Sequence, residues 1–133
     1  MKKIEHIGIA VQDIEASNKL FVKILGKNSY KLENLKSEGV ITSFFQIGES
    51  KIELVAPTNE ESLISRYLSK NKEGMHHIAF AVENIEKEME RLKNEGIRLL
   101  NETPKNGAEN KFICFLHPED TNGVLIELCQ EIK

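Results

Sequence analysis

The chain has 133 residues, of which 40% are apolar and 29% are charged, and its net charge is −3. These values are typical of one soluble globular domain that folds without disulfides. Interspersed charges disfavour nucleic acid and anionic membranes as partners, and no apolar run reaches the ~20 residues of a membrane span. We expect no secretory signal at the N-terminus, because the charged Glu5 precedes any apolar stretch. Because Cys114 and Cys129 form no CxxC motif, we expect a reduced, cytoplasmic protein.

The first half of the chain predicts a strand, a helix and three further strands. Residues 4–11 are mostly apolar and β-branched, as in a strand, and Asp13 is well placed to cap a helix over 14–25. Gly26 is expected to end that helix. The strands that follow are expected at about 29–33, 40–47 and 51–56.

The second half repeats this order after a short connection. Thr58 and Glu61 have the spacing of a capping box and predict a connecting helix at about 60–70. A strand near 75–82 and a helix ended by Gly96 follow. The later elements are expected at 85–95 for that helix and at about 97–101, 111–117 and 124–129 for the strands. We therefore expect an α+β fold with two tandem βαβββ modules in one domain, spanning about 1–57, 58–73 (the connection) and 74–133.

Metal-ligand residues recur at matching places in the two halves. Residues 4–14 read IEHIGIAVQDI and residues 75–85 read MHHIAFAVENI, so an offset of 71 places His6 on His77. The last strand of each half likewise carries a glutamate, Glu53 in KIELV and Glu127 in LIELC. Two imidazoles and two carboxylates would form one mixed site that suits Co²⁺, Mn²⁺, Zn²⁺, Ni²⁺ or Fe²⁺ rather than Ca²⁺.

Each of these residues also has an ordinary structural interpretation. A single strand histidine is usually a core or surface residue, and a glutamate between Ile and Leu can face solvent on an alternating strand. The recurrence of both residue types favours the metal site. His76 competes with His77, but neighbouring strand residues face opposite ways, and the register with His6 selects His77.

Longer stretches around these residues resemble a known family. The similarity is to the methylmalonyl-CoA epimerases of the vicinal oxygen chelate, or glyoxalase–bleomycin resistance, superfamily. It is carried by IEHIGIAV at 4–11, ELVAP at 53–57, KNKEGMHHIAF at 70–80, FLHP at 115–118 and GVLIEL at 123–128. The resemblance implies a curved mixed β-sheet around a divalent metal, with Co²⁺ or Mn²⁺ favoured over Zn²⁺ and Ni²⁺. It implies as metal ligands His6, Glu53, His77 and Glu127.

The resemblance also implies a reaction, the interconversion of (2R)- and (2S)-methylmalonyl-CoA through a metal-stabilised enolate, in a homodimer. Glu127 is expected to act as acid–base at one face of C2, and Glu53 or a metal-bound water at the other. Some family members carry a glutamine at the place of Glu53. Some also carry a second acid–base carboxylate where this chain has Thr42, which argues against a symmetric two-glutamate mechanism here.

Substrate contacts and alternative functions are open at this stage. The phosphates of a CoA tail favour nearby cations, and the candidates are Lys70, Lys72 and Lys111, although exposed lysines often serve only solubility. His117 is either a substrate contact or a polar turn residue. The alternative functions are a glyoxalase I-type lactoylglutathione lyase and a non-catalytic binding protein of the same fold. An extradiol dioxygenase fits less well, because Glu53 would fill a position that Fe²⁺ needs open.

Overall fold

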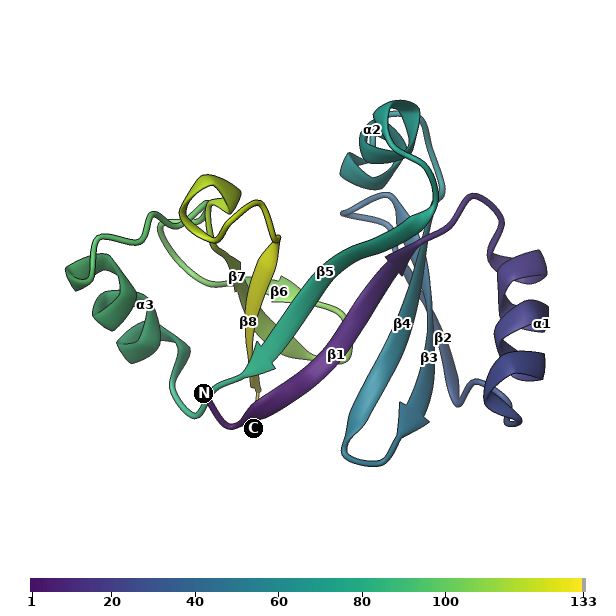
Figure 1. Ribbon diagram of the computed structural model, residues 1–133, viewed down its shortest axis with the longest axis horizontal. Coiled ribbons are helices and arrows are strands. Elements are labelled where there is room, and N and C mark those ends of the chain that lie inside the picture. Colours follow the sequence, from purple (N-terminus) through teal and green to yellow (C-terminus); the bar gives the residue numbers. More distant parts are fainter. Residues whose placement is uncertain (133) are drawn as a thin grey trace. The chain divides into compact units, whose positions relative to one another are not determined.

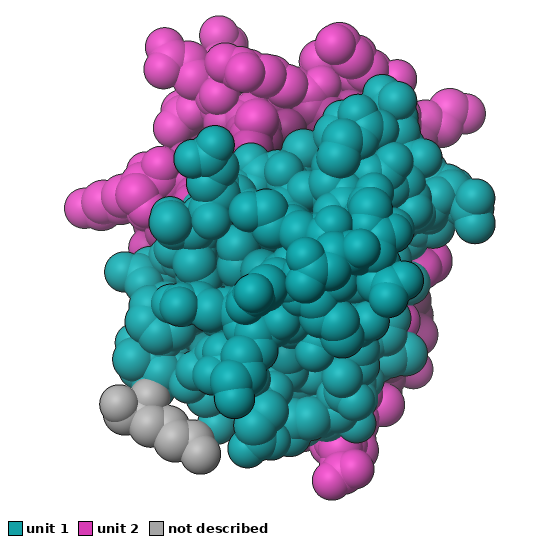
Figure 2. Space-filling model, turned by 90° about the vertical axis from the view of Figure 1, so that its left-hand side faces the viewer, with its two compact units in different colours: residues 1–6, 77–133 teal, residues 7–76 magenta. Residues whose placement is uncertain are grey.

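The computed structural model describes residues 1–132, which fall into two compact units, shown as ribbons in Figure 1 and in separate colours in Figure 2. Unit 1 comprises residues 1–6 and the chain from His77 onward, and unit 2 comprises Ile7–His76. Strand β1 contributes to both units. The elements, in chain order, are β1 (Lys3–Ala10), α1 (Ile14–Leu25), β2 (Lys31–Leu35), β3 (Val40–Ile47), β4 (Ser50–Pro57), α2 (Leu63–Lys70), β5 (Gly74–Ala81), α3 (Ile85–Asn94), β6 (Lys105–Gly107), β7 (Lys111–Phe115), the 3-10 turn η1 (Pro118–Asp120) and β8 (Ile126–Glu131).

The element order confirms the predicted α+β architecture of two tandem βαβββ modules. The first module is β1–α1–β2–β3–β4 and the second is β5–α3–β6–β7–β8, with α2 between them. Helices α1 and α3 begin where the sequence predicts, because the side chains of Asp13 and Asn84 accept hydrogen bonds from the first helical turns. Gly26, with φ +72°, ends α1 as expected. No helix among residues 1–132 is long and apolar enough to cross a bilayer.

Unit 2 is a sheet in the order β2-β3-β4-β1, packed against α1 and α2. Strands β2, β3 and β4 are antiparallel neighbours, and the N–H of Val11 donates to the carbonyl of Val55 at 2.9 Å. Leu54 packs in the cluster with α1, whereas Val55 packs in the cluster with α2. Because side chains alternate along a strand, Glu53 lies on the Val55 side of β4, away from α1.

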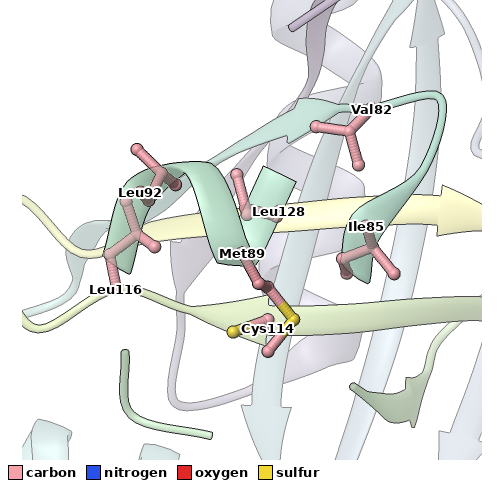
Figure 3. Close-up of a cluster of buried hydrophobic side chains, with 7 residues drawn as sticks. All are labelled: Val82, Ile85, Met89, Leu92, Cys114, Leu116 and Leu128. Atoms are coloured by element: carbon pink, nitrogen blue, oxygen red, sulfur yellow. The ribbon is translucent and has the colours of Figure 1, made fainter. Parts of the chain in front are cut away.

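Unit 1 has the strand order β1-β5-β8-β7-β6, with α3 packed on β7 and β8. Strands β5 and β8 are parallel, whereas β8, β7 and β6 are antiparallel neighbours. Figure 3 shows the core beneath α3, formed by Val82, Ile85, Met89, Leu92, Cys114, Leu116 and Leu128. Because Leu128 and Cys114 face this core, alternation turns Glu127 and Phe115 to the other face of the sheet. The apolar packing of α3 therefore determines which face of the sheet Glu127 and Phe115 occupy.

The strand predicted at 97–101 is wrong. The N–H of Ile97 donates to the carbonyl of Leu92 and so closes the C-terminus of α3, where Gly96 has φ +85°. The N–H of Arg98 then donates to the side chain of Asp120 at 2.8 Å. Only an isolated bridge between Leu99 and Leu116 remains, and the strand of this region is β6, at Lys105–Gly107.

The start of the connecting helix also differs from the prediction. Helix α2 begins at Leu63 rather than near residue 60, and its cap is Ser62, whose hydroxyl accepts the N–H of Ser65 at 3.1 Å. The capping box predicted from Thr58 and Glu61 is therefore wrong. The N–H of Thr58 donates instead to the carbonyl of Gly39 at 2.8 Å. This bond extends the pairing of β3 and β4 beyond Val40 and Pro57.

One ion pair of unit 1 predicts a pH-dependent stability. The Arg98 guanidinium donates to both carboxylate oxygens of Asp120, each at 3.0 Å. Side-chain and backbone hydrogen bonds from Arg98 lower the pKa of Asp120 from 3.8 to about 2. Because the folded-state pKa lies below the ordinary value, the ionised carboxylate stabilises the folded protein above that ordinary value, and this contribution is lost as the pH falls through about 2.

We predict that Asp120→Asn lowers the free energy of unfolding at neutral pH, and that the difference from the wild type disappears at low pH. Urea unfolding of both proteins across the acid range measures this difference. High salt should also reduce it, because the pair is exposed to solvent. A difference that stays constant from neutral pH to below the pKa of Asp120 would contradict the assignment.

Candidate metal centre

Two histidines of unit 1 place their ring nitrogens side by side. His6 on β1 and His77 on β5 are buried, with exposed fractions of 6% and 7%. Their Nε2 atoms are 3.1 Å apart, and the rings meet edge to face. Strands β1 and β5 are neighbours in the sheet of unit 1, which brings residues 71 positions apart into contact.

Glu127 completes a cluster of three polar side chains. It lies on β8 opposite Ala79 of the parallel strand β5, and alternation puts residues 77 and 79 on one face. Its Oε1 is 3.5 Å from Nε2 of His77, and its Oε2 is 3.8 Å from Nε2 of His6. The three residues are buried, and their ligand atoms all lie within 4.8 Å of one another.

This donor set fits a divalent transition-metal ion. Nitrogen and oxygen ligands bind such ions at roughly 2.0–2.2 Å, which separates neighbouring ligand atoms by roughly 3.0–3.5 Å. The separations of 3.1, 3.5 and 3.8 Å found here need little adjustment. Two imidazoles and one carboxylate suit Zn²⁺, Co²⁺, Ni²⁺ or Fe²⁺ better than Ca²⁺, which prefers oxygen ligands throughout.

An aromatic ring borders the cluster. Phe115 pairs with Glu127 in the register of β7 and β8, so both side chains lie on the same face. Its ring meets that of His77 edge to face, with centroids 6.1 Å apart. The ammonium of Lys105 lies 5.8 Å from the Phe115 centroid. An apolar wall beside charged groups lowers the local dielectric and strengthens electrostatic interactions in the site.

The structure adds Glu5, a residue that the sequence analysis did not single out. Its side chain is buried, with an exposed fraction of 4%, and its Oε1 is 2.9 Å from Nδ1 of His6. A carboxylate at this nitrogen is a frequent companion of metal-binding histidines. The only signal in the sequence is an acidic residue directly before a candidate ligand, and strand alternation would normally send that residue to the opposite face.

Glu53 and Thr42 lie in unit 2. Glu53 is buried on β4 opposite Phe44, and its role as a fourth ligand stays a prediction. Thr42 is 1% exposed on β3, and its hydroxyl donates to the carbonyl of Glu33 at 3.4 Å. His76 also belongs to unit 2, where its ring meets that of Tyr67 edge to face at a centroid distance of 4.7 Å.

The candidate substrate-binding residues differ in their surroundings. Lys70 and Lys72 are exposed in unit 2. Lys111 is only 6% exposed and, with Lys2, Lys3 and Glu5, lines a cavity of about 550 Å³ in unit 1.

His117 precedes η1, and its Nδ1 accepts the N–H of Glu119 at 3.2 Å, so its ring caps the turn. The same residue lines a second cavity of unit 1, of about 870 Å³. The turn role that the sequence left open for His117 is thus present in the structure, and its substrate contact stays a prediction.

Comparison with known proteins adds independent findings. Residues 5–115 match the Glyoxalase/Bleomycin resistance protein/Dioxygenase superfamily. The uncharacterized protein YqjC of Bacillus subtilis is 35% identical over 98% of this chain and 93% of its own length. The mitochondrial methylmalonyl-CoA epimerase of Homo sapiens is 41% identical over 96% of this chain and 73% of its own length. The Streptomyces coelicolor methylmalonyl-CoA epimerase in complex with 2-nitronate-propionyl-CoA superimposes with a TM-score of 0.95 at 33% identity, covering 100% of this chain and 99% of its own.

We predict that the cluster binds a divalent ion and that the ion stabilises the fold. Co²⁺ at about 100 times its dissociation constant should add about 2.7 kcal/mol to the free energy of unfolding. His77→Ala should weaken Co²⁺ binding by more than the roughly 10–100-fold typical of losing an outer partner of a ligand. Calorimetric titration with Co²⁺ measures the affinity of the wild type and of the variant. His76→Ala is the control and should keep the wild-type affinity; equal losses in the two variants would argue against the cluster.

Proposed function

The chain belongs to the Glyoxalase/Bleomycin resistance protein/Dioxygenase superfamily, and from this premise we propose that it is a divalent-metal-dependent methylmalonyl-CoA epimerase. The observation that carries the proposal is the buried cluster of His6, His77 and Glu127. The similarity to methylmalonyl-CoA epimerases over nearly the whole chain supports this choice of reaction within the superfamily. A cytoplasmic homodimer, as expected from the sequence, stays a prediction.

The proposed reaction needs a site that tolerates new negative charge. The C2 proton of methylmalonyl-CoA lies between a thioester and a carboxylate and is only weakly acidic, and its removal leaves charge mainly on the thioester oxygen. When bound by His6, His77 and Glu127, a divalent cation supplies the Lewis acidity that stabilises such charge. The two imidazoles contribute no negative charge of their own, so among these three ligands only Glu127 would offset the positive charge of the ion. The ring of Phe115 helps to exclude water beside His77.

We propose that Glu127 exchanges the proton at one face of C2. Its two oxygens point to different partners, with Oε1 nearer His77 and Oε2 nearer His6, so one oxygen can take a proton while the other stays in place. A positioned carboxylate of this kind typically contributes about 10²–10⁴ in rate. Thr42 carries no carboxylate and its hydroxyl is bonded to the backbone of β2, so Glu53 and a metal-bound water stay the two candidates for the opposite face.

The first test is hydrogen exchange at C2. With Co²⁺ bound, the wild type should incorporate deuterium from D₂O into C2 of methylmalonyl-CoA and interconvert the epimers. Glu127→Gln should lower both rates by about 10²–10⁴ because it removes the base. Glu15→Gln, which neutralises an exposed glutamate in the first turn of α1, is the control and should leave both rates unchanged.

This assay, together with a parallel assay on a glutathione hemithioacetal, separates the alternative functions. Near-full turnover by Glu127→Gln with metal bound would remove this residue from the mechanism. A wild type that instead isomerises a glutathione hemithioacetal would be a glyoxalase I-type lyase. A protein that turns over neither substrate would be a non-catalytic binding protein.

A second test concerns the CoA tail. Among the three candidate lysines we propose Lys111 as the contact to a phosphate, because it is buried beside a cavity whereas Lys70 and Lys72 are exposed. Lys111→Gln should raise KM for methylmalonyl-CoA with little change in kcat, since binding to a remote phosphate is the same in the ground state and the transition state. Lys70→Gln and Lys72→Gln serve as charge-matched controls.

Methylmalonyl-pantetheine, which lacks the nucleotide phosphates, decides whether Lys111 acts through them. The effect of Lys111→Gln on KM should disappear with this truncated thioester. If the increase in KM persists, Lys111 instead acts on the acyl end of the substrate or on the fold, and the phosphate assignment is wrong.

A further inference from the structure

Glu5 is a buried carboxylate that the proposed mechanism does not use. It lies on β1 directly before His6, and only 4% of its surface is exposed. Burying an ionised carboxylate is costly unless hydrogen bonds and opposite charges compensate it, and an apolar residue on this strand would cost less to bury. Its contact with Nδ1 of His6, at 2.9 Å, offsets part of this cost. The position therefore calls for a role.

The two ring nitrogens of His6 face different partners. Nδ1 faces the carboxylate of Glu5, whereas Nε2 faces Nε2 of His77 at 3.1 Å and the carboxylate of Glu127 at 3.8 Å. An ionised carboxylate only accepts hydrogen bonds, so the proton of this contact belongs to Nδ1. In the neutral ring the lone pair then lies on Nε2, which is the nitrogen that faces the other two residues of the cluster.

We propose that Glu5 is the positioning residue of the metal centre. By holding Nδ1–H of His6, it selects the tautomer and ring orientation that turn the Nε2 lone pair toward His77 and Glu127. A carboxylate at the far nitrogen also makes the imidazole a stronger ligand. This inference rests on the proposed metal site but not on the identity of the substrate.

The internal repeat does not place a matching carboxylate directly before His77. The offset that places His6 on His77 places Glu5 on His76, so the second half carries an imidazole where the first carries a carboxylate. His76 meets the ring of Tyr67 edge to face. The residue directly before each histidine of the cluster is therefore different, a carboxylate before His6 and an imidazole before His77.

The first measurement is metal affinity, with Zn²⁺ as the probe and a chromophoric chelator as competitor. Glu5→Met keeps the length of the side chain but removes the acceptor, and should weaken binding by roughly 10–100-fold. Glu5→Gln keeps a neutral acceptor and should lie between Glu5→Met and the wild type. Glu83→Gln removes the same charge at the rim of the same cavity, away from His6, and should bind as the wild type does.

The second measurement reads the tautomer directly, in Zn²⁺-loaded protein labelled with ¹⁵N at histidine. Long-range ¹H–¹⁵N spectra should show that Nδ1 of His6 carries the proton in the wild type and in Glu5→Gln. This proton should resonate downfield and exchange slowly with water, and in Glu5→Met it should move upfield and exchange faster. A purely structural role for Glu5 would change the melting temperature without this signature.

The inference would be overturned by a wild-type spectrum in which His6 binds Zn²⁺ through Nδ1, or by a folded Glu5→Met that binds Zn²⁺ as tightly as the wild type. If Glu5→Met does not fold, the spectra and affinities of the wild type and Glu5→Gln still decide. Failure to bind Zn²⁺ at all would overturn this inference together with the metal centre. Zinc binding that responds to Glu5 without epimerisation of methylmalonyl-CoA would count against the proposed reaction alone.

Discussion

The contact between the Nε2 atoms of His6 and His77, 3.1 Å apart in a buried site, is the interaction that the rest of unit 1 holds in place. Two imidazole nitrogens can face each other in an interior only if they share a proton or a cation, because an unpaired buried polar group costs free energy. Glu127 supplies the negative charge that makes a cation favourable there. The cluster is thus a poor design for stability alone and a suitable one for binding a metal ion.

The two faces of the sheet of unit 1 have different roles, one in apolar packing and the other in carrying the polar cluster. Its α3 face is closed by the apolar core of Figure 3, and strand alternation assigns Leu128 to that core and Glu127 to the opposite face. The parallel pairing of β5 and β8 then sets Glu127 opposite Ala79, two residues beyond His77. A slip of one residue in this register would exchange the two faces and remove the carboxylate from the histidines, so the core that stabilises the unit also determines the geometry of the site.

The two halves of the chain share their fold more closely than they share their polar residues. Both halves fold as βαβββ and both place a histidine on the first strand and a glutamate on the last. Around this shared frame the residues differ, since Glu5 in the first half corresponds to His76 in the second. An epimerase must handle a proton at two faces of one carbon, and those faces are related by reflection rather than by rotation. Unequal groups on the two sides are therefore compatible with the proposed reaction.

Local sequence by itself determined helices α1 and α3 and the ligand pattern. Asp13 and Asn84 cap helices whose apolar period is unambiguous, and the offset of 71 residues brought His6 and His77 into one hypothesis. Tertiary structure alone decided two features. The segment at 97–101 looks like a strand, but the backbone of Arg98 bonds the side chain of Asp120, 22 residues away. The contact of Glu5 with His6 depends on burial of two neighbouring residues of one strand. Patterns of period 2 and 3.6 encode which face a residue takes, whereas such contacts depend on where distant segments lie once the chain has folded.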